Sequence, residues 1–285
     1  MIHFIIPVFN DTKSLRILLN KLNKNLEKKK RLGVVTVVDD FSSEAIDIST
    51  NKLKFIKKFE ILRLKKNVGS QNAIAFGLQY LSKLKKDKTI IVMDSDGEDN
   101  PAQINNMIKY AENFPNYIVT SNRTKRKETL LIRVLYISHL FLTFIFTGKW
   151  ISFGNYTCFQ HKNLNSLLKN RNIWSAYPAA VIKNNNIIRL FAARKKRFCG
   201  KSKISIYKLF FHSFRIISVF HFRVFIFSLI YFFFLDFVFF ELNKKIFYIS
   251  IVPIILFNLC IVSTKIIIIL KKMNYNSKWV NFIKR

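Results

Sequence analysis

Cysteine is scarce in this sequence: there are three, Cys158, Cys199 and Cys260, and they lie far apart. An odd number without a C-x-x-C pair indicates neither a disulfide framework nor a thiolate zinc site, so we expect a reducing, cytoplasmic setting. A signal peptide is also missing, because the N-terminal segment MIHFIIPVFN reaches polar residues after a short apolar run. We therefore expect the polar part of the chain to stay in the compartment where it is made.

Acidic residues are few as well. The chain has 16 Asp and Glu against 48 Lys and Arg, which gives a formal net charge of +32. Such an excess can bind nucleic acid, but the basic residues do not accompany a recognisable nucleic-acid motif. Attraction to anionic lipid headgroups explains the charge more simply, with a compositional bias toward Lys, Asn, Ile and Phe as a further contribution. We expect a membrane as partner and no nucleic acid.

The two longest hydrophobic runs lie near the C-terminus, at 224–242 and 246–270. Each is long enough for about 20 helical residues to cross a hydrocarbon core about 30 Å thick, so we predict a two-helix transmembrane hairpin. Eight Lys or Arg in 194–215 and five in 271–285 flank the hairpin, against two in its short loop. Both flanks and the polar half of the chain should therefore be cytoplasmic. Buried core helices are the alternative, for which such long apolar runs are unusual.

The first part of the chain alternates short apolar, β-branched segments with segments of helical periodicity. We expect strands at 2–7, 34–38, 60–64, 89–93 and 117–120, and helices at 12–30, 71–84 and 102–113. This alternation implies an α/β fold whose mostly parallel sheet is covered by helices on both faces. Ligands of such sheets bind beyond the C-terminal ends of the strands. Five polar residues fall there: Asn10, Asp39, Asp40, Asp94 and Asp96.

Four carboxylates lie within six positions, from Asp94 to Asp99, directly after an expected strand. Residues two apart on an extended chain project to the same side, so Asp94 and Asp96 can be directed at one point. Mg²⁺ uses few protein ligands together with substrate phosphates, and Mn²⁺ also suits oxygen donors. The expected guest is therefore a metal-bound diphosphate, and a solvated acidic turn is the alternative. Gly97 permits the chain to turn within the cluster.

Four motifs taken together resemble the inverting family 2 glycosyltransferases of GT-A fold. They are PVFN at 7–10, VVDDFS at 37–42, NVGSQNA at 67–73 with Gly77, and MDSDGED at 93–99. The resemblance covers the N-terminal part of the chain, and implies that Asp94 and Asp96 hold the metal and the sugar nucleotide. The nucleotide-sugar pocket that it implies is formed by Pro7, Phe9, Asn10, Asp39, Asp40, Asn67, Gly69 and Asp94. Two departures are mild: Phe9 stands where the family usually has Tyr, and Asp11 where it has Glu.

A narrower resemblance, to the polyprenyl-phosphate glycosyltransferases of the dolichyl-phosphate mannosyltransferase type, depends on three further stretches. They are DGEDNP at 96–101, SNR at 121–123, and RFCGKSK at 197–203 before the hydrophobic hairpin. In that subgroup the position of Glu98 can supply a third metal ligand. The resemblance implies transfer of a sugar, with inversion, from a nucleotide-sugar donor to a polyprenyl (undecaprenyl-type) phosphate. Because the Q-x-x-R-W motif of processive synthases is missing, one transfer per acceptor is favoured.

The acceptor chemistry follows from these expected substrates. A phosphate monoester has its second pKa at about 6, so it is already anionic near neutral pH and needs no strong general base. Positioning and charge neutralisation would then do most of the catalysis. Four basic residues are candidates to hold phosphates, with a lipid-headgroup or solvated contact as the alternative for each: Arg123, Arg133, Arg197 and Lys203.

Two other functions remain open at this point. A glycosyltransferase acting on a lipid-linked saccharide or another hydroxyl acceptor, in cell-surface polysaccharide synthesis, would require a carboxylate base, for which Glu98 or Asp99 is available. A catalytically inactive, membrane-anchored binding protein is the non-enzyme alternative. The sequence does not determine the sugar, the nucleotide, the choice between Mg²⁺ and Mn²⁺, or whether the chain forms a homo-oligomer.

The expected organisation has four parts. These are a nucleotide-sugar-binding core at 1–125, an acceptor-side and juxtamembrane region at 126–215, two transmembrane helices at 216–271, and a basic cytoplasmic tail at 272–285. The apolar stretch 130–146, with embedded Arg133 and His139, predicts an interfacial helix beside the lipid acceptor, or an ordinary core helix. The whole is expected at the inner (cytoplasmic) membrane as a multi-pass protein with its catalytic domain in the cytoplasm.

Overall fold

The computed structural model describes residues 1–84, 88–123, 130–193, 195–200, 206–239, 244–273 and 280–284. The chain forms two compact units. The first, called the sheet unit here, comprises Met1–Glu128, Ser152–Lys203 and Tyr275–Arg285. The second, the helical unit, comprises Thr129–Ile151 and Ile204–Asn274. The helical unit includes the apolar stretch 130–146, for which an interfacial helix and an ordinary core helix were the two predictions.

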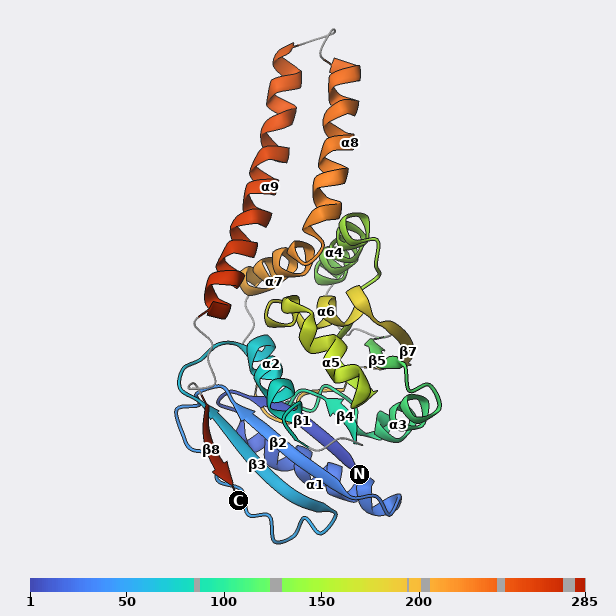
Figure 1. Ribbon diagram of the computed structural model, residues 1–285, viewed down its shortest axis with the longest axis vertical. Helices are drawn as coiled ribbons and strands as arrows, with labels where there is room; N and C mark the ends of the chain where they lie inside the picture. The colour runs from blue at the N-terminus through green and yellow to red at the C-terminus, as the bar shows by residue number, and fades with distance from the viewer. Residues whose placement is uncertain are drawn as a thin grey trace. The chain divides into compact units, whose positions relative to one another are not determined.

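An eight-stranded sheet in the order β7-β5-β6-β4-β1-β2-β3-β8 forms the centre of the sheet unit (Figure 1). Its strands are β1 (Ile2–Val8), β2 (Gly33–Asp39), β3 (Ile56–Leu64), β4 (Thr89–Val92), β5 (Tyr117–Arg123), β6 (Phe153–Gln160), β7 (Asn186–Ala192) and β8 (Val280–Lys284). The pairs β1–β2, β1–β4, β2–β3 and β5–β7 are parallel, whereas β6 and β8 run antiparallel to their neighbours. β1, β2 and β4 are buried along their lengths, which accounts for their continuous apolar runs.

Helices cover both faces of this sheet, as predicted. They are α1 (Thr12–Lys28), α2 (Ser70–Leu81), η1 (Pro101–Gln103), α3 (Ile104–Asn113), α5 (Lys162–Lys169), η2 (Arg171–Trp174) and α6 (Tyr177–Asn184). Phe4 and Ile6 of β1 belong to the core that also contains the buried side chains of α1 and α3. Ile5 projects to the other face, where a Cβ at Gly77 of α2 would lie 2.8 Å from its side chain. Gly77 therefore allows α2 to pack closely on the sheet.

The C-terminal residues return to the sheet unit as its edge strand. β8 pairs antiparallel with β3, with Lys284 opposite Glu60 and Val280 opposite Leu64. The sequence predicted a basic tail here and no strand. The pairing covers the backbone of β3, which would otherwise present an open sheet edge.

The helical unit consists of α4 (Leu130–Thr147), α7 (Ile206–Ser218), α8 (His221–Phe239) and α9 (Lys244–Met273). Both α8 and α9 are long and apolar enough to cross a membrane, and they lie side by side in antiparallel directions (Figure 1). Most of their side chains are exposed, with Phe237 at 88%, whereas helices of a soluble core would be buried. The two apolar helices expected at 224–242 and 246–270 are therefore present, although residues 240–243 lie outside the described ones.

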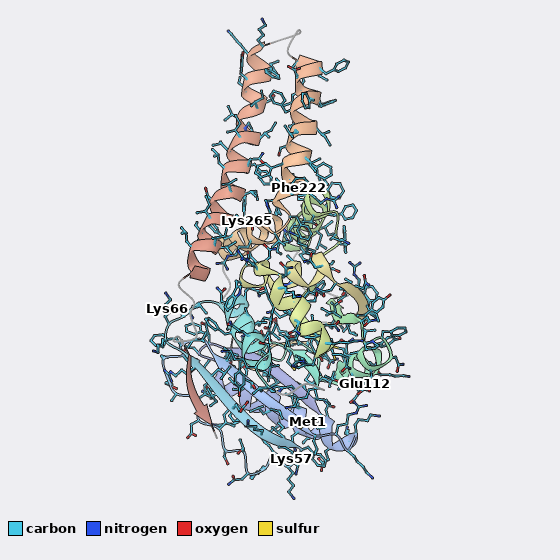
Figure 2. The ribbon with its side chains drawn as sticks, viewed as in Figure 1. Met1, Lys57, Lys66, Glu112, Phe222 and Lys265 are labelled. Atoms are coloured by element: carbon cyan, nitrogen blue, oxygen red, sulfur yellow. The ribbon has the colours of Figure 1, made fainter. Side chains whose placement is uncertain are left out.

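Polar contacts join α8 to α9 at two levels. Asn258 donates a hydrogen bond to the Ser228 hydroxyl at 2.8 Å. Lys265, labelled in Figure 2, has its Nζ 2.7 Å from His221 Nδ1. These contacts explain how polar side chains are accommodated within two apolar helices, because each finds a partner on the neighbouring helix. The apolar stretch 130–146 is helical, as expected, within α4.

Candidate active site

The C-terminal ends of β1, β2 and β4 meet at one edge of the sheet, because these strands are adjacent and parallel. The polar residues that follow them come together there: Asn10 and Asp11 after β1, Asp39 and Asp40 at the end of β2, and Asp94 and Asp96 after β4. Pro7 and Phe9 belong to the β1 end, and Asn67 and Gly69 precede α2. The structure thus brings the motifs at 7–10, 37–42, 67–73 and 93–99 to one edge.

Asn10 links the loops that follow β1 and β2. Its backbone N–H donates to Ser42 Oγ at 2.9 Å, and its side-chain oxygen accepts from the Ser43 backbone N–H at 2.8 Å. Asn10 has a φ of 50°, a left-handed conformation that Asn adopts more readily than most residues. The preceding residue, Phe9, is 42% exposed. The two loops therefore form one joined wall of the site.

Asp39 and Asp40 differ in how their carboxylates are used. Asp39 is buried and accepts from the Ser42 N–H at 2.9 Å, whereas its Oδ2 lies 3.7 Å from Arg63 and has no hydrogen-bond partner among the described residues. Asp40 accepts from the backbone N–H groups of Val68 at 2.7 Å and Gly69 at 2.8 Å. Asp40 thus holds the loop before α2, and Asp39 retains an acceptor for a ligand.

Burial raises the pKa of Asp40 to about 6, although its two amide hydrogen bonds act in the opposite direction. The neighbouring Asp39 carboxylate adds to the increase. Asn67 donates to the backbone carbonyl of Asp40 at 3.2 Å, which fixes the same loop from its other side. Gly69 has a φ of 86°, a conformation that side chains rarely adopt.

Asp94 and Asp96 are held by different partners. Asn155 of β6 donates to Asp94 Oδ1 at 2.9 Å, and the Asp94 backbone N–H donates to the Asp99 carboxylate at 2.9 Å. The Glu98 backbone N–H donates to Asp96 Oδ1 at 2.9 Å. Asn155 was not predicted from the sequence, because β6 lies in the stretch where the resemblance offers no motif. Its position opposite the end of β4 became apparent only from the sheet order.

Negative charge at this point is incompletely compensated. Burial raises the pKa of Asp96 to about 6, and the nearby Asp94 carboxylate adds to the increase, as Glu98 also does. A bound divalent cation would relieve this repulsion, and two carboxylates are hard oxygen donors of the kind Mg²⁺ and Mn²⁺ accept. Among the residues that the structure describes, no group of three or more His, Cys, Asp or Glu could hold a metal ion. Asp94 and Asp96 therefore fit a metal that draws its other ligands from phosphate or water, and Glu98 as a third ligand stays a prediction.

A short segment, residues 195–200, covers this acidic loop. The Lys195 N–H donates to the Glu98 carbonyl at 3.1 Å, and the Phe198 N–H donates to the Asp96 carbonyl at 2.9 Å. The Phe198 ring packs against Gly97, where a Cβ would lie 2.3 Å from ring carbon Cε2. Gly97 has a φ of 84°, so both its backbone conformation and its contact with Phe198 require glycine.

Arg197 bridges two of the acidic loops. Its Nη1 donates to Asp96 Oδ2 at 2.7 Å, and its Nη2 donates to Asp11 Oδ2 at 3.2 Å. Arg197 was predicted as a phosphate-binding residue, but its contact with two carboxylates was not. Of the other basic candidates, Arg123 ends β5, Arg133 lies in α4, and Lys203 falls outside the described residues.

Known proteins provide an independent comparison. Residues 3–171 match the family described as Glycosyl transferase family 2. Mannosyl-3-phosphoglycerate synthase from Rubrobacter xylanophilus has a similar structure, with a TM-score of 0.52, 11% identity, and 77% of this chain and 72% of that chain covered. A second similar structure is glucosyl-3-phosphoglycerate synthase from Mycobacterium tuberculosis in complex with Mn²⁺, uridine diphosphate and phosphoglyceric acid. Its TM-score is 0.50 at 10% identity, and 78% of each chain is covered. At these identities the likeness shows the fold alone.

A curated relative is more similar in sequence over a shorter stretch. An uncharacterized protein of Methanocaldococcus jannaschii is 36% identical over 114 residues, which cover 38% of this chain and 45% of the relative. The chain thus spans less than half the length of the curated relative that it matches.

Proposed function

Because the chain belongs to glycosyl transferase family 2, we propose that it transfers a sugar, with inversion, from a nucleotide-sugar donor to a polyprenyl phosphate of the undecaprenyl type. The reaction would take place at the cytoplasmic face of the inner membrane, in which α8 and α9 anchor the chain. The observation that carries the proposal is Arg197, whose guanidinium lies directly on Asp96 within the acidic loop. A guanidinium at that place can bind an anionic acceptor beside a metal-bound diphosphate.

The donor would lie along the joined loops that follow β1 and β2. Asp39 Oδ2 lacks a hydrogen bond among the described residues, so a donor group of a nucleotide can satisfy it. Asn10 and Asp40 hold the loops around it through their bonds to Ser42, Ser43, Val68 and Gly69. The Mycobacterium tuberculosis structure of the same fold contains uridine diphosphate, which supports a nucleoside diphosphate as the donor's leaving group.

Asp94 and Asp96 would hold Mg²⁺ or Mn²⁺. When bound, such an ion neutralises charge on the departing nucleoside diphosphate. The protein's own contribution is to fix the two carboxylates, through Asn155 on one side and the Glu98 amide on the other. The Mn²⁺ in the neighbouring structure supports a divalent metal here as well.

A lipid phosphate fits this site better than a hydroxyl acceptor. A hydroxyl needs a base, and Asp99 already accepts from the Asp94 backbone, which leaves Glu98 as the candidate. A phosphate monoester needs none, because it is anionic near neutral pH. The two apolar helices of the helical unit are consistent with a lipid-linked acceptor. The hydroxyl acceptor of a lipid-linked saccharide remains the second candidate.

The proposal is tested by incubating the purified chain in detergent with a panel of sugar nucleotides and Mg²⁺ or Mn²⁺. Each donor is paired with undecaprenyl phosphate and, as matched control, with dephosphorylated undecaprenol. Mass spectrometry of the lipid should detect one added sugar on the phosphate and none on the alcohol. Equal transfer to both lipids would exclude the phosphate as nucleophile, and transfer only to a lipid-linked saccharide would favour the hydroxyl acceptor.

A second test separates the acceptor from the donor. Arg197→Ala combined with Lys203→Ala should raise the KM for lipid phosphate by about tenfold or more, the loss typical of a charged hydrogen bond. At saturating Mg²⁺ or Mn²⁺, the KM for the sugar nucleotide should change little. An equal increase for both substrates would assign the two residues to the donor diphosphate instead.

A further inference from the structure

We propose that Arg197 and a divalent metal ion compete for the Asp96 carboxylate, and that Asp11 retains Arg197 beside the site when the metal is bound. Asp11 is then a positioning residue for an arginine that exchanges a carboxylate for a phosphate. This inference rests on the proposed function for the role of the phosphate, but the competition itself can be measured without any sugar transfer.

Both oxygens of Asp96 are occupied in the structure. Oδ1 accepts from the Glu98 backbone N–H, and Oδ2 accepts from Arg197 Nη1 at 2.7 Å. The side chains of Arg197 and Asp96 are only 21% and 14% exposed, so solvent weakens their attraction little. Each of these oxygens keeps a second lone pair, so a metal ion can bind Asp96, but it would then lie beside both donors. Arg197 is the one whose departure relieves repulsion between two cations.

Asp11 offers the arginine a second anchor. Arg197 Nη2 donates to Asp11 Oδ2 at 3.2 Å, and Asp11 belongs to the loop after β1, separate from the acidic loop. The guanidinium presents several donors in a rigid plane, so one can change partner while another stays bound. Loss of the Asp96 contact thus leaves Arg197 tethered within the site.

The backbone around Arg197 keeps it in reach. Two backbone hydrogen bonds, from Lys195 to Glu98 and from Phe198 to Asp96, pin the segment 195–200 to the acidic loop. Phe198 also packs against the hydrophobic core, and Lys21 lies 4.3 Å above its ring. Exchange of partners therefore needs rotation of the Arg197 side chain and no movement of the segment.

One donor of the arginine is still unused. Arg197 Nε is buried and has no hydrogen-bond partner among the described residues. A buried N–H without an acceptor is costly, and a phosphate oxygen would supply one. Nε and the Nη1 that metal binding releases lie on different sides of the guanidinium, so they supply two separate donors for phosphate oxygens. The site is thus built to receive an anion after the metal has taken Asp96.

Competition predicts the effect of removing the arginine on metal affinity. Mn²⁺ alone is titrated into the full chain in detergent, and free Mn²⁺ is followed by electron paramagnetic resonance. Arg197→Ala should tighten Mn²⁺ binding about tenfold, within the usual range of site-to-site coupling. Lys196→Ala is the matched control, because it removes the same charge from an exposed neighbour that does not contact Asp96. It should change the affinity less than about twofold, and Arg197→Lys should lie between the two.

An equal increase in Mn²⁺ affinity in Arg197→Ala and Lys196→Ala would overturn the proposal. It would show that the affinity depends on long-range charge and not on the contact with Asp96. An unchanged affinity in Arg197→Ala would overturn it as well. Neither result depends on whether undecaprenyl phosphate is the acceptor, so a failed transfer assay leaves this inference standing and a failed titration leaves the proposed function standing.

The role of Asp11 is tested by a double-mutant cycle on Mn²⁺ affinity. In the Arg197→Ala background, Asp11→Asn removes only negative charge and should weaken Mn²⁺ binding. In the wild-type background the Asp11–Arg197 contact is present with and without the metal and cancels in the affinity, so Asp11→Asn should weaken Mn²⁺ binding by the same factor. Asp11→Glu should restore the wild-type affinity. A weakening that is smaller by about threefold or more in the wild-type background, or a tightening there, would show that Arg197 leaves Asp11 when the metal binds, and would refute the tether.

Discussion

Gly97→Ala should destabilise the fold for two reasons, the positive φ of this residue and its contact with Phe198. Its φ of 84° costs an L-residue about 1–2 kcal/mol, and a Cβ there would lie 2.3 Å from the Phe198 ring. Forcing extra volume into a packed contact costs about 1–3 kcal/mol. The two together predict a loss of stability of about 2–5 kcal/mol.

Gly200→Ala is the control for this variant. Gly200 has a φ of 68°, but nothing lies within 4 Å of the Cβ it would gain. The entropy that alanine removes from the unfolded chain is common to both variants and cancels in their difference. Gly97→Ala should therefore be less stable than Gly200→Ala by the contact with Phe198, about 1–3 kcal/mol, or about 2–12 °C in Tm for a unit of this size.

Thermal unfolding of the full chain in detergent, followed by tryptophan fluorescence, measures this difference. The combination of Gly97→Ala with Phe198→Ala provides the decisive comparison, because the smaller side chain removes the clash. In that background the cost of Gly97→Ala should fall to that of Gly200→Ala. An undiminished cost would show that Phe198 does not press on Gly97, and would remove the packing argument for the segment 195–200.

Three further predictions follow from the same site and fold. Asp96→Asn should abolish metal-dependent turnover while leaving the Tm within a few degrees of wild type, because Asp96 lies beyond the end of β4; normal activity would contradict its role as a metal ligand. Reporter tags before Met1 and after Arg285 should both face the cytoplasm, because β1 and β8 belong to one sheet and two apolar helices intervene; tags on opposite sides of the membrane would imply an odd number of crossings. Burial favours the protonated form of Asp40 in the folded chain and raises its pKa from 3.8 to about 6. Between these pH values the folded state binds more protons than the unfolded state, so stability should fall as the pH rises from about 4 to about 6. Asp40→Asn should flatten that part of the profile of Tm against pH, and an unchanged slope would assign the dependence to another group.

Much of the sheet unit was predictable because its signals are local. The helix expected at 12–30 is α1, and its buried leucines follow the helical spacing of one face. The strand ends at Asp39 and Asp94 were marked by carboxylates directly after apolar, β-branched runs. Because parallel strands have their C-terminal ends at the same edge of a sheet, the prediction of a parallel sheet was enough to place these carboxylates together.

The missed features depend on contacts between distant parts of the chain. Arg197 and Asp11 are 186 positions apart, and no periodicity or spacing relates them. Asn155 reaches Asp94 only because the antiparallel β6 inserts between β4 and β5. β6 and β7 lie in the stretch where the resemblance offered no motif, so neither strand could be placed from the sequence.

The pairing of β8 with β3 also sets an order for the biogenesis of the chain. β3 is synthesised early, at Ile56–Leu64, but its edge partner emerges more than 200 residues later, after both apolar helices. Closing so long a loop makes this pairing one of the last steps of folding. If only one of the two helices crosses the membrane, β8 ends on the far side and β3 stays open, a form prone to edge-to-edge association. The final strand thereby acts as a check that the hairpin has inserted correctly.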